Sequence, residues 1–309
     1  MLIHLFNNFH NGDLLLNEPV IRNLCKNNPH HTFVLFCRYN SFMFKDIPNL
    51  TIQLAVQYDN NFFFNIINTE HIVFNLWIAA LGTQSHITGF DLSSLECNLP
   101  NYFTAFKKMI NYINATHKFN INFDDYSEDT YLPRLPDTDI SDFLRWKENR
   151  GNNNKLIFYY NYLPQSGQGI FTQDHSTFII NLATNMPECT FIVPKFCPEI
   201  KNYTLTHNNV IICQEHFNYK EDITCENLVK NQKILEECDY SIHFDIGACF
   251  YYVCESSKGA NNIVLYLTKT NYYYNNLQSN SKDINQKTIM LLSNNVADAY
   301  LKLDSIINK

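Results

Sequence analysis

Apolar residues in the first half of the chain follow two alternating spacings. Short apolar runs, typical of buried strands, are each followed by segments in which apolar residues recur every three or four positions, as in helices. The alternation predicts βαβ units and a mostly parallel sheet. Strands are expected at residues 2–6, 32–37, 50–54 and 72–76, and helices at 14–25 and 102–113.

A second series of the same kind begins at residue 155, after a segment rich in proline and asparagine that is typical of a connection between domains. We therefore predict an α/β fold of two Rossmann-like domains that face each other across a cleft, residues 1–150 and residues 151–309. The last helix could pack back on the N-terminal domain. Strands are expected at 156–160, 189–193, 209–213, 240–244 and 262–267, and helices at 141–147, 175–185, 224–238, 248–256 and within 283–308.

The composition narrows the class of protein. Hydrophobic residues make up 45% of the 309 residues and charged residues 17%, as expected of a folded chain. The net charge of −7 and the lack of a basic stripe argue against nucleic-acid binding. No signal-peptide pattern and no transmembrane segment is recognised, so we expect a cytoplasmic protein, with peripheral contact to a membrane left open.

No metal site is expected. None of the ten cysteines forms a CxxC pair, and most lie in apolar strands or helices, so we interpret them as buried free thiols in a reducing compartment. Asp137-Thr138-Asp139 has the form of the DxD pattern with which some sugar transferases hold a metal–diphosphate. It falls in the connection, far from any strand end, and we assign it no metal role.

Ligands of parallel sheets bind beyond the carboxyl ends of the strands, and this rule points at two turns. In the first, Gly12-Asp13 stands between the strand at 2–6 and a helix. Asp13 could cap that helix by accepting backbone N–H bonds, with Gly12 in an unusual backbone conformation. Alternatively, Asp13 could be a general base. Spacing alone favours the cap.

The second turn, Asp245-Ile246-Gly247, stands between the strand at 240–244 and the helix that starts at Ala248. Free N–H groups at that helix start could hold a diphosphate, which Gly247 would allow to come close. A simple capped helix is the alternative. A third loop, with Gln165 and Gly167, follows the strand at 156–160 and lacks the Lys-Ser/Thr of a Walker loop; it could cover a phosphate or be a plain loop.

The segment HNGDLLLNEPVIRNLCKNNPHHTFVLF, residues 10–36, resembles the opening of the heptosyltransferase-like glycosyltransferases, family nine, which have the GT-B fold. That family shows a strand, a Gly-Asp turn, an apolar stretch, a proline, a helix, a second proline and a second strand. Gly12, Asp13, Pro19 and Pro29 match in order and spacing.

The second turn takes the place of the family's Asp-Ser/Thr-Gly at the donor diphosphate. Ile246 replaces the hydroxyl residue, and Phe250 replaces the histidine usual three positions after the glycine. Each replacement would remove a side-chain contact to phosphate, while backbone contacts from Gly247 and Ala248 would remain.

The resemblance implies an inverting, metal-independent glycosyltransferase that moves a sugar from a nucleotide-sugar to a hydroxyl of a glycan or lipid-linked acceptor. Asp13 would be the base, and the nucleotide-sugar would be a co-substrate, with no other cofactor. Lys195 would assist the diphosphate, although a solvated surface lysine is the simpler interpretation. Gln214 and Glu215 would meet the ribose or base, although such residues on loops are usually exposed.

Two alternatives stay open. The departures at Ile246 and Phe250 are also what a non-catalytic protein that binds nucleotide-sugars or carbohydrates on the same fold would show. The second alternative is a hydrolase that cleaves nucleotide-sugars with water. The fold alone does not separate these functions, because one architecture hosts many of them.

Overall fold

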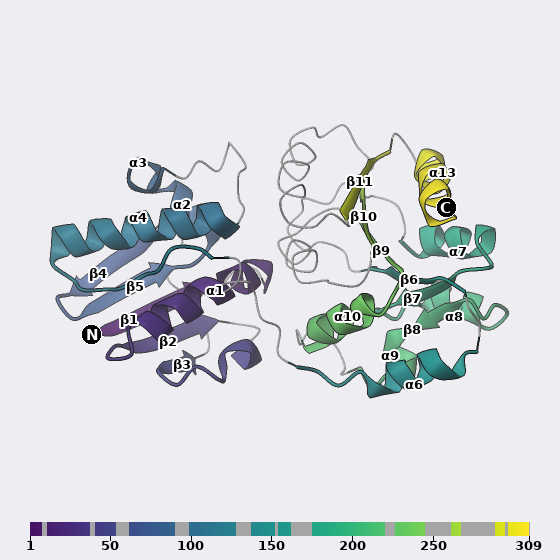
Figure 1. The fold of residues 1–309 in the computed structure, drawn as a ribbon, viewed down its shortest axis with the longest axis horizontal. Helices are drawn as coiled ribbons and strands as arrows, with labels where there is room; N and C mark the ends of the chain where they lie inside the picture. Colours follow the sequence, from purple (N-terminus) through teal and green to yellow (C-terminus); the bar gives the residue numbers. More distant parts are fainter. Residues whose placement is uncertain are drawn as a thin grey trace. The chain divides into compact units, whose positions relative to one another are not determined.

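The chain folds into two compact units, Met1–Pro136 and Asp137–Lys309, which are described separately here (Figure 1). The division lies ahead of helix α6 (Ser141–Asn149), whereas the boundary predicted from the sequence lies just after it. The structure, a computed structural model, describes residues 1–7, 11–37, 41–53, 62–89, 99–127, 137–151, 154–161, 175–219, 226–244, 261–266, 288–293 and 296–308.

The first unit is built on a five-stranded sheet in the order β3-β2-β1-β5-β4. All neighbours run parallel except β4, which is antiparallel to β5. The chain moves outward from β1 to β3 and returns to the other side of β1 with β5, so strand order reverses between β1 and β5. The strands are β1 (Leu2–Asn7), β2 (Thr32–Cys37), β3 (Leu50–Gln53), β4 (Phe64–Asn68) and β5 (His71–Asn75).

A hydrogen bond joins the two long helices of the first unit, α1 and α4, and α4 packs against the sheet. The Tyr102 hydroxyl on α4 donates to Asn17 Oδ1 on α1, and the Phe106 ring lies 5.5 Å from that of Phe74 on β5. Helix α1 starts three residues earlier than predicted, so Gly12-Asp13 is part of its first turn and not a separate turn ahead of it. The helices are α1 (Asn11–Asn27), α2 (Ile78–Gly82), α3 (Ser85–Thr88), α4 (Leu99–His117) and the 3-10 helix η1 (Ser41–Phe44).

The second unit contains a six-stranded parallel sheet in the order β11-β10-β9-β6-β7-β8. The chain moves outward from β6 through β7 to β8 and returns to the other side of β6 with β9. Strand order therefore reverses between β6 and β9. The strands are β6 (Leu156–Tyr159), β7 (Thr190–Val193), β8 (Val210–Ile212), β9 (Tyr240–Phe244), β10 (Asn261–Tyr266) and β11 (Thr288–Leu292).

Helices cover both faces of this second sheet. One face packs on α7, α8 and α13, and the other on α6 and α10, with Phe143 of α6 buried against Phe158 of β6. The helices are α6, α7 (His175–Asn185), α8 (Pro198–Thr204), α9 (Cys213–His216), α10 (Glu226–Glu236) and α13 (Val296–Ile307).

The C-terminal segment differs from its prediction. Residues 283–308 were expected to form only helices, but the strand β11 comes first and α13 follows. Helix α13 lies beside α7 in Figure 1, where the Tyr300 hydroxyl donates to the Phe178 carbonyl oxygen at 3.1 Å and the two rings stack. Ala299, Leu303 and Ile307 are buried there, so the last helix is part of the second unit's core.

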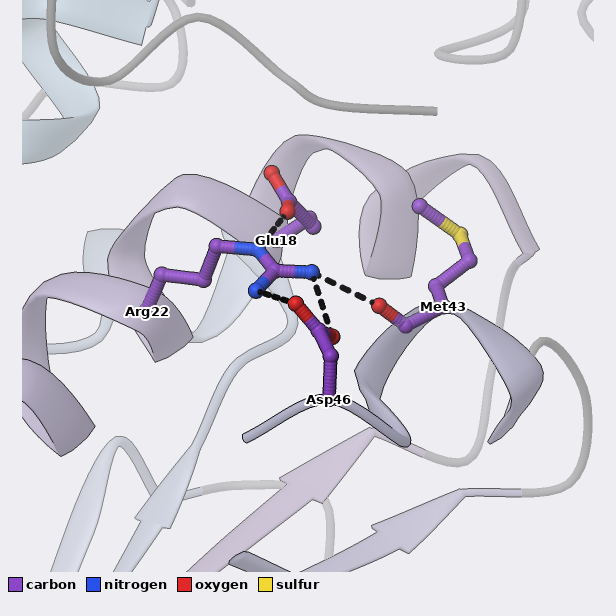
Figure 2. A network of polar contacts seen from close by, with 4 residues as sticks. All are labelled: Glu18, Arg22, Met43 and Asp46. Carbon is purple, nitrogen blue, oxygen red and sulfur yellow. Dashed lines mark hydrogen bonds and ion pairs between the residues drawn. The ribbon is translucent and has the colours of Figure 1, made fainter. Parts of the chain in front are cut away.

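A charged network joins α1 to η1 and to the segment after η1 (Figure 2). The Arg22 guanidinium donates to both carboxylate oxygens of Asp46, at 2.7 and 3.0 Å, to the Met43 carbonyl oxygen at 2.9 Å and to Glu18. The Glu18 side chain is fully buried, whereas that of Asp46 is 67% exposed. Burial alone would lower the pKa of Arg22, but the two carboxylates outweigh it and raise that pKa above its ordinary value, so Arg22 stays charged.

Arg22→Ala should destabilise the first unit, because it removes the guanidinium from a fully buried carboxylate. We expect a loss of about 3–5 kcal/mol in the free energy of unfolding. Asp46→Ala is the matched control, because its exposed ion pair should contribute less than about 1 kcal/mol. Urea unfolding followed by Trp77 fluorescence, in a Trp146→Phe background, reports on the first unit, since these are the chain's two tryptophans. Equal losses in the two variants would contradict the prediction.

Candidate functional site

The first candidate region is the carboxyl end of β1, where strand order reverses. Strand β1 ends at Asn7 and α1 begins at Asn11, so the helix N-terminus lies next to the reversal, with Gly12 and Asp13 in its first turn. The side chain of Asp13 lies outside the described part of the structure. A helix N-terminus at a reversal of strand order is the usual location of a ligand on such sheets.

Buried polar groups hold the helices at this edge. Asn17 Nδ2 donates to the Leu76 carbonyl oxygen at 2.6 Å, and the Tyr102 hydroxyl donates to Asn17 Oδ1. Asn75, at the end of β5, accepts a 3.0 Å hydrogen bond from the backbone N–H of Trp77. The asparagines are fully buried, so these bonds fix α1 and α4 to the end of β5. These contacts are not predicted from the sequence, in which the one signal is a polar residue, Asn17, among apolar helix positions.

The second candidate region is the carboxyl end of the second sheet, where hydrogen bonds join the loops after β6 and β7 to each other and to α9. Asn161, after β6, donates from Nδ2 to the Lys195 carbonyl oxygen at 2.9 Å, and its Oδ1 accepts from the Lys195 N–H at 3.0 Å. Gln214, after β8, accepts from the Phe196 N–H through Oε1 at 2.5 Å. We call Asn161, Lys195, Phe196 and Gln214 the edge clamp.

The edge clamp brings two predicted site residues together. Lys195 has an exposed side chain on a fixed backbone, and Gln214 holds the next residue of the same loop. Glu215 instead forms a 2.8 Å ion pair with Lys201 of α8. Contacts of Lys195, Gln214 and Glu215 with a nucleotide stay predictions.

The remaining predicted site residues lie outside the described residues. These are Gln165 and Gly167 after β6, and the turn Asp245, Ile246, Gly247 and Ala248 with the helix expected after it. Strand β9 ends at Phe244, and it flanks the reversal of strand order next to β6. The second turn thus directly follows a strand at the reversal, whereas in the first unit Gly12-Asp13 lies in the first turn of the helix that follows β1.

Three polar side chains form a chain of hydrogen bonds inside the second sheet. Ser241 on β9 donates through its hydroxyl to Asn262 Oδ1 on β10 at 2.6 Å, and His243 Nε2 lies 2.8 Å from the Ser241 oxygen. Because the single hydroxyl proton is used toward Asn262, His243 must donate from Nε2. Complete burial lowers the pKa of His243 to about 3, so its imidazole is neutral. Tyr160 packs its ring 5.7 Å from that of His243.

The described residues contain no group of three or more His, Cys, Asp or Glu side chains placed to hold a metal ion. Asp139, of the DxD pattern, accepts a 2.8 Å hydrogen bond from the Ser141 N–H at the start of α6. Six cysteines in the described ranges are free thiols, five of them buried, and Cys197 is half-buried. Among these same residues, no helix combines the length and the apolar character that crossing a bilayer requires.

Known structures share this architecture over the whole chain, although no protein-family model and no curated protein matches the sequence. The Staphylococcus aureus MnaA–UDP structure matches with a TM-score of 0.51 and 9% identity, covering 100% of this chain and 88% of the other. The Neisseria meningitidis UDP-GlcNAc 2-epimerase bound to UDP-GlcNAc matches with a TM-score of 0.50 and 12% identity, covering 100% and 92%. The family 9 glycosyl transferase of Veillonella parvula gives a TM-score of 0.45 and 11% identity, covering 99% and 90%.

The chain has the GT-B fold. The predicted class of two Rossmann-like α/β domains in series is confirmed. At these identities the likeness carries the fold alone, and the reaction has to be argued from the site.

Acidification should destabilise the second unit through His243. Its pKa is lower in the folded state than the ordinary 6.5, so its stabilising effect is complete above pH 6.5 and declines as the pH falls from 6.5 toward 3. One such group removes about 1.4 kcal/mol between pH 7.5 and 5.5, a range in which most carboxylates do not titrate. His243→Gln should lack this part of the pH dependence. The free energy of unfolding is measured at each pH by urea unfolding followed by Trp146 fluorescence, with Trp77 replaced by Phe. An equal change of this free energy with pH in the wild type and in His243→Gln would contradict the role given to His243.

Proposed function

We propose that the protein is an inverting, metal-independent glycosyltransferase of the heptosyltransferase-like type. It transfers a sugar from a nucleotide-sugar to a hydroxyl of a glycan or lipid-linked acceptor. One observation carries the proposal: each unit reverses its strand order once, and each of the two segments with candidate chemistry comes after a strand at such a reversal. Gly12-Asp13 lies in the first turn of the helix that follows β1, and Asp245-Ile246-Gly247 directly follows β9. Both segments are selected in the sequence by their place after strands and not by the order of strands in the sheet, so their coincidence with both reversals supports a shared role in binding a ligand.

In the first unit, Asp13 is the general base of the proposal. It belongs to the first turn of α1, next to the reversal between β1 and β5. Its carboxylate would take the proton of the acceptor hydroxyl while that oxygen attacks the anomeric carbon, and the bond from this carbon to the diphosphate oxygen breaks on the opposite face. Proton transfer by a positioned base contributes about 10²–10⁴-fold to a rate.

In the second unit, the backbone N–H groups of Gly247 and Ala248 bind the diphosphate in the proposal. Helix N-termini attract anions, and a stabilised diphosphate is a better leaving group, so no metal ion is required for this step. Ile246 has no hydroxyl to donate, which leaves the backbone as the main source of hydrogen bonds. Lys195, exposed on the same sheet edge, supplies positive charge.

Two neighbours of this fold bind uridine nucleotides in their structures, UDP in one and UDP-GlcNAc in the other. A nucleoside diphosphate is therefore the first probe. Isothermal titration of the full chain with UDP and ADP tests the binding part of the proposal. The chemistry is tested by incubating UDP- and ADP-sugars with and without acceptors and identifying the products.

Asp13→Asn should abolish transfer, by at least about 100-fold, because an amide does not accept the acceptor's proton. Nucleotide binding should be nearly unchanged, since the proposal assigns the nucleotide to the second unit. Asp125→Asn is the control, a carboxylate of the same unit that is 83% exposed and pairs with Lys107. Initial rates of sugar transfer and calorimetric affinities are the measurements.

Other outcomes of these incubations would indicate a different function. Full turnover by Asp13→Asn would remove the base from the mechanism. Epimerised nucleotide-sugar formed without acceptor would indicate an epimerase, and free sugar released by water would indicate a hydrolase. Binding of nucleotide-sugar with no turnover over a broad set of acceptors would indicate a binding protein.

A further inference from the structure

The edge clamp fixes two consecutive loop residues at the carboxyl end of β7. Asn161 makes two hydrogen bonds to the backbone of Lys195, and Gln214 accepts one from the backbone of Phe196. The two clamping side chains come from the loop after β6 and from α9, which follows β8 directly, and these two strands lie on either side of β7. A surface loop held by polar side chains from both neighbours has little freedom to move its backbone.

This fixed backbone carries an exposed aromatic ring. Phe196 is 42% exposed, whereas the last strand residue before it, Val193, is fully buried. Other large apolar residues exposed in the described part of this unit, such as Leu205 and Leu301, are aliphatic. Exposing a phenyl ring costs free energy that burial would recover, and a rigid backbone prevents the ring from turning inward by a loop movement.

The position of the ring suits one part of a nucleotide. In the sheet order β9-β6-β7, the loop after β7 lies two strand spacings from the end of β9, or about 10 Å. An extended nucleoside diphosphate has a similar length between its base and its outer phosphate. The base of a nucleotide whose diphosphate is bound after β9 can therefore reach the loop after β7.

We propose that Phe196 is a stacking surface for the nucleobase of the donor, held in place by Asn161 and Gln214. The inference rests on the proposed function, because it takes the diphosphate at the turn after β9 as its starting point. A phenyl face stacks on any planar base, so this contact contributes affinity without selecting between uracil and adenine. In this proposal Phe196 contacts the nucleobase, and Asn161 and Gln214 are positioning residues that hold the backbone of its loop.

The test compares ligands with and without a base. Phe196→Ala should weaken binding of UDP and ADP by about 5- to 100-fold, the usual effect of removing one aromatic stacking partner. Binding of inorganic pyrophosphate, which has no base, should not change. Phe196→Trp and Phe196→Tyr should restore nucleotide affinity. Leu205→Ala, an aliphatic residue of the same unit that is 72% exposed, is the matched control and should have no effect. Isothermal titration gives all the affinities.

A native thiol provides a second readout. Cys197 follows Phe196 directly and is half-buried, while the other described cysteines are buried. Saturating UDP should slow alkylation of Cys197 by iodoacetamide, measured by peptide mass spectrometry, and pyrophosphate should not.

The outcomes separate the two proposals. If the wild-type protein binds no nucleotide, both the proposed function and the stacking role fail. If the wild type binds UDP or ADP and Phe196→Ala binds them equally well, the stacking role alone is overturned. An equal loss of affinity for pyrophosphate and for nucleotides in Phe196→Ala would show that the substitution disturbs the whole carboxyl edge of the second sheet. This result also overturns a role that is specific to the base.

Discussion

In each unit, one central strand pairs with a neighbour on both sides, and this pairing determines the arrangement of the other strands and helices. Strand β1 bonds to β2 and β5, and β6 bonds to β7 and β9, so each donates and accepts along two ladders. All of their apolar side chains except the partly buried Leu2 are buried. Parallel strands need long crossovers, and these crossovers are right-handed. In the second unit the direction change follows from this constraint: α7 and α8 cover one face before the reversal, and α10 covers the other face after it. Successive crossovers that leave toward opposite faces keep the carboxyl edge between β6 and β9 accessible to a ligand.

Polar groups buried near these edges are paired with specific partners. Asn17 joins two helices to the end of β5, and Asn161 joins the loops after β6 and β7. Each amide of this kind satisfies backbone groups that would otherwise be costly to remove from water. Loops that carry candidate chemistry are thereby attached to a rigid scaffold by side chains, which is how a binding site keeps its geometry before a ligand arrives.

The sequence predicted the elements that follow strong periodicity, and it failed where periodicity is weak. Helix α7 and strand β9 were predicted with their observed bounds. Strand β4 was missed because its residues are half-exposed at an edge, and β11 was taken as helical because a short apolar run has no period of its own. In the edge clamp, Asn161 and Lys195 are 34 positions apart in the sequence, and Phe196 and Gln214 are 18 apart. No local sequence pattern predicts contacts of this range. Gly12-Asp13 and Asp245-Gly247 were found from their place after strands, and the sheet order then added the reversals that the sequence alone does not reveal.

The irregular pairing of β4 has a consequence for the protein in concentrated solution. This outermost ribbon carries Ile67 half in water, and its register with β5 shifts between Ile66 and Asn68. A regular border strand would offer a straight row of amide donors and acceptors to any similar ribbon from another molecule. The register shift bends and twists the row of backbone donors and acceptors of β4, so a strand from a second molecule cannot pair with it in regular register. The irregular register thus disfavours the addition of a strand from another molecule at the β4 edge of this sheet.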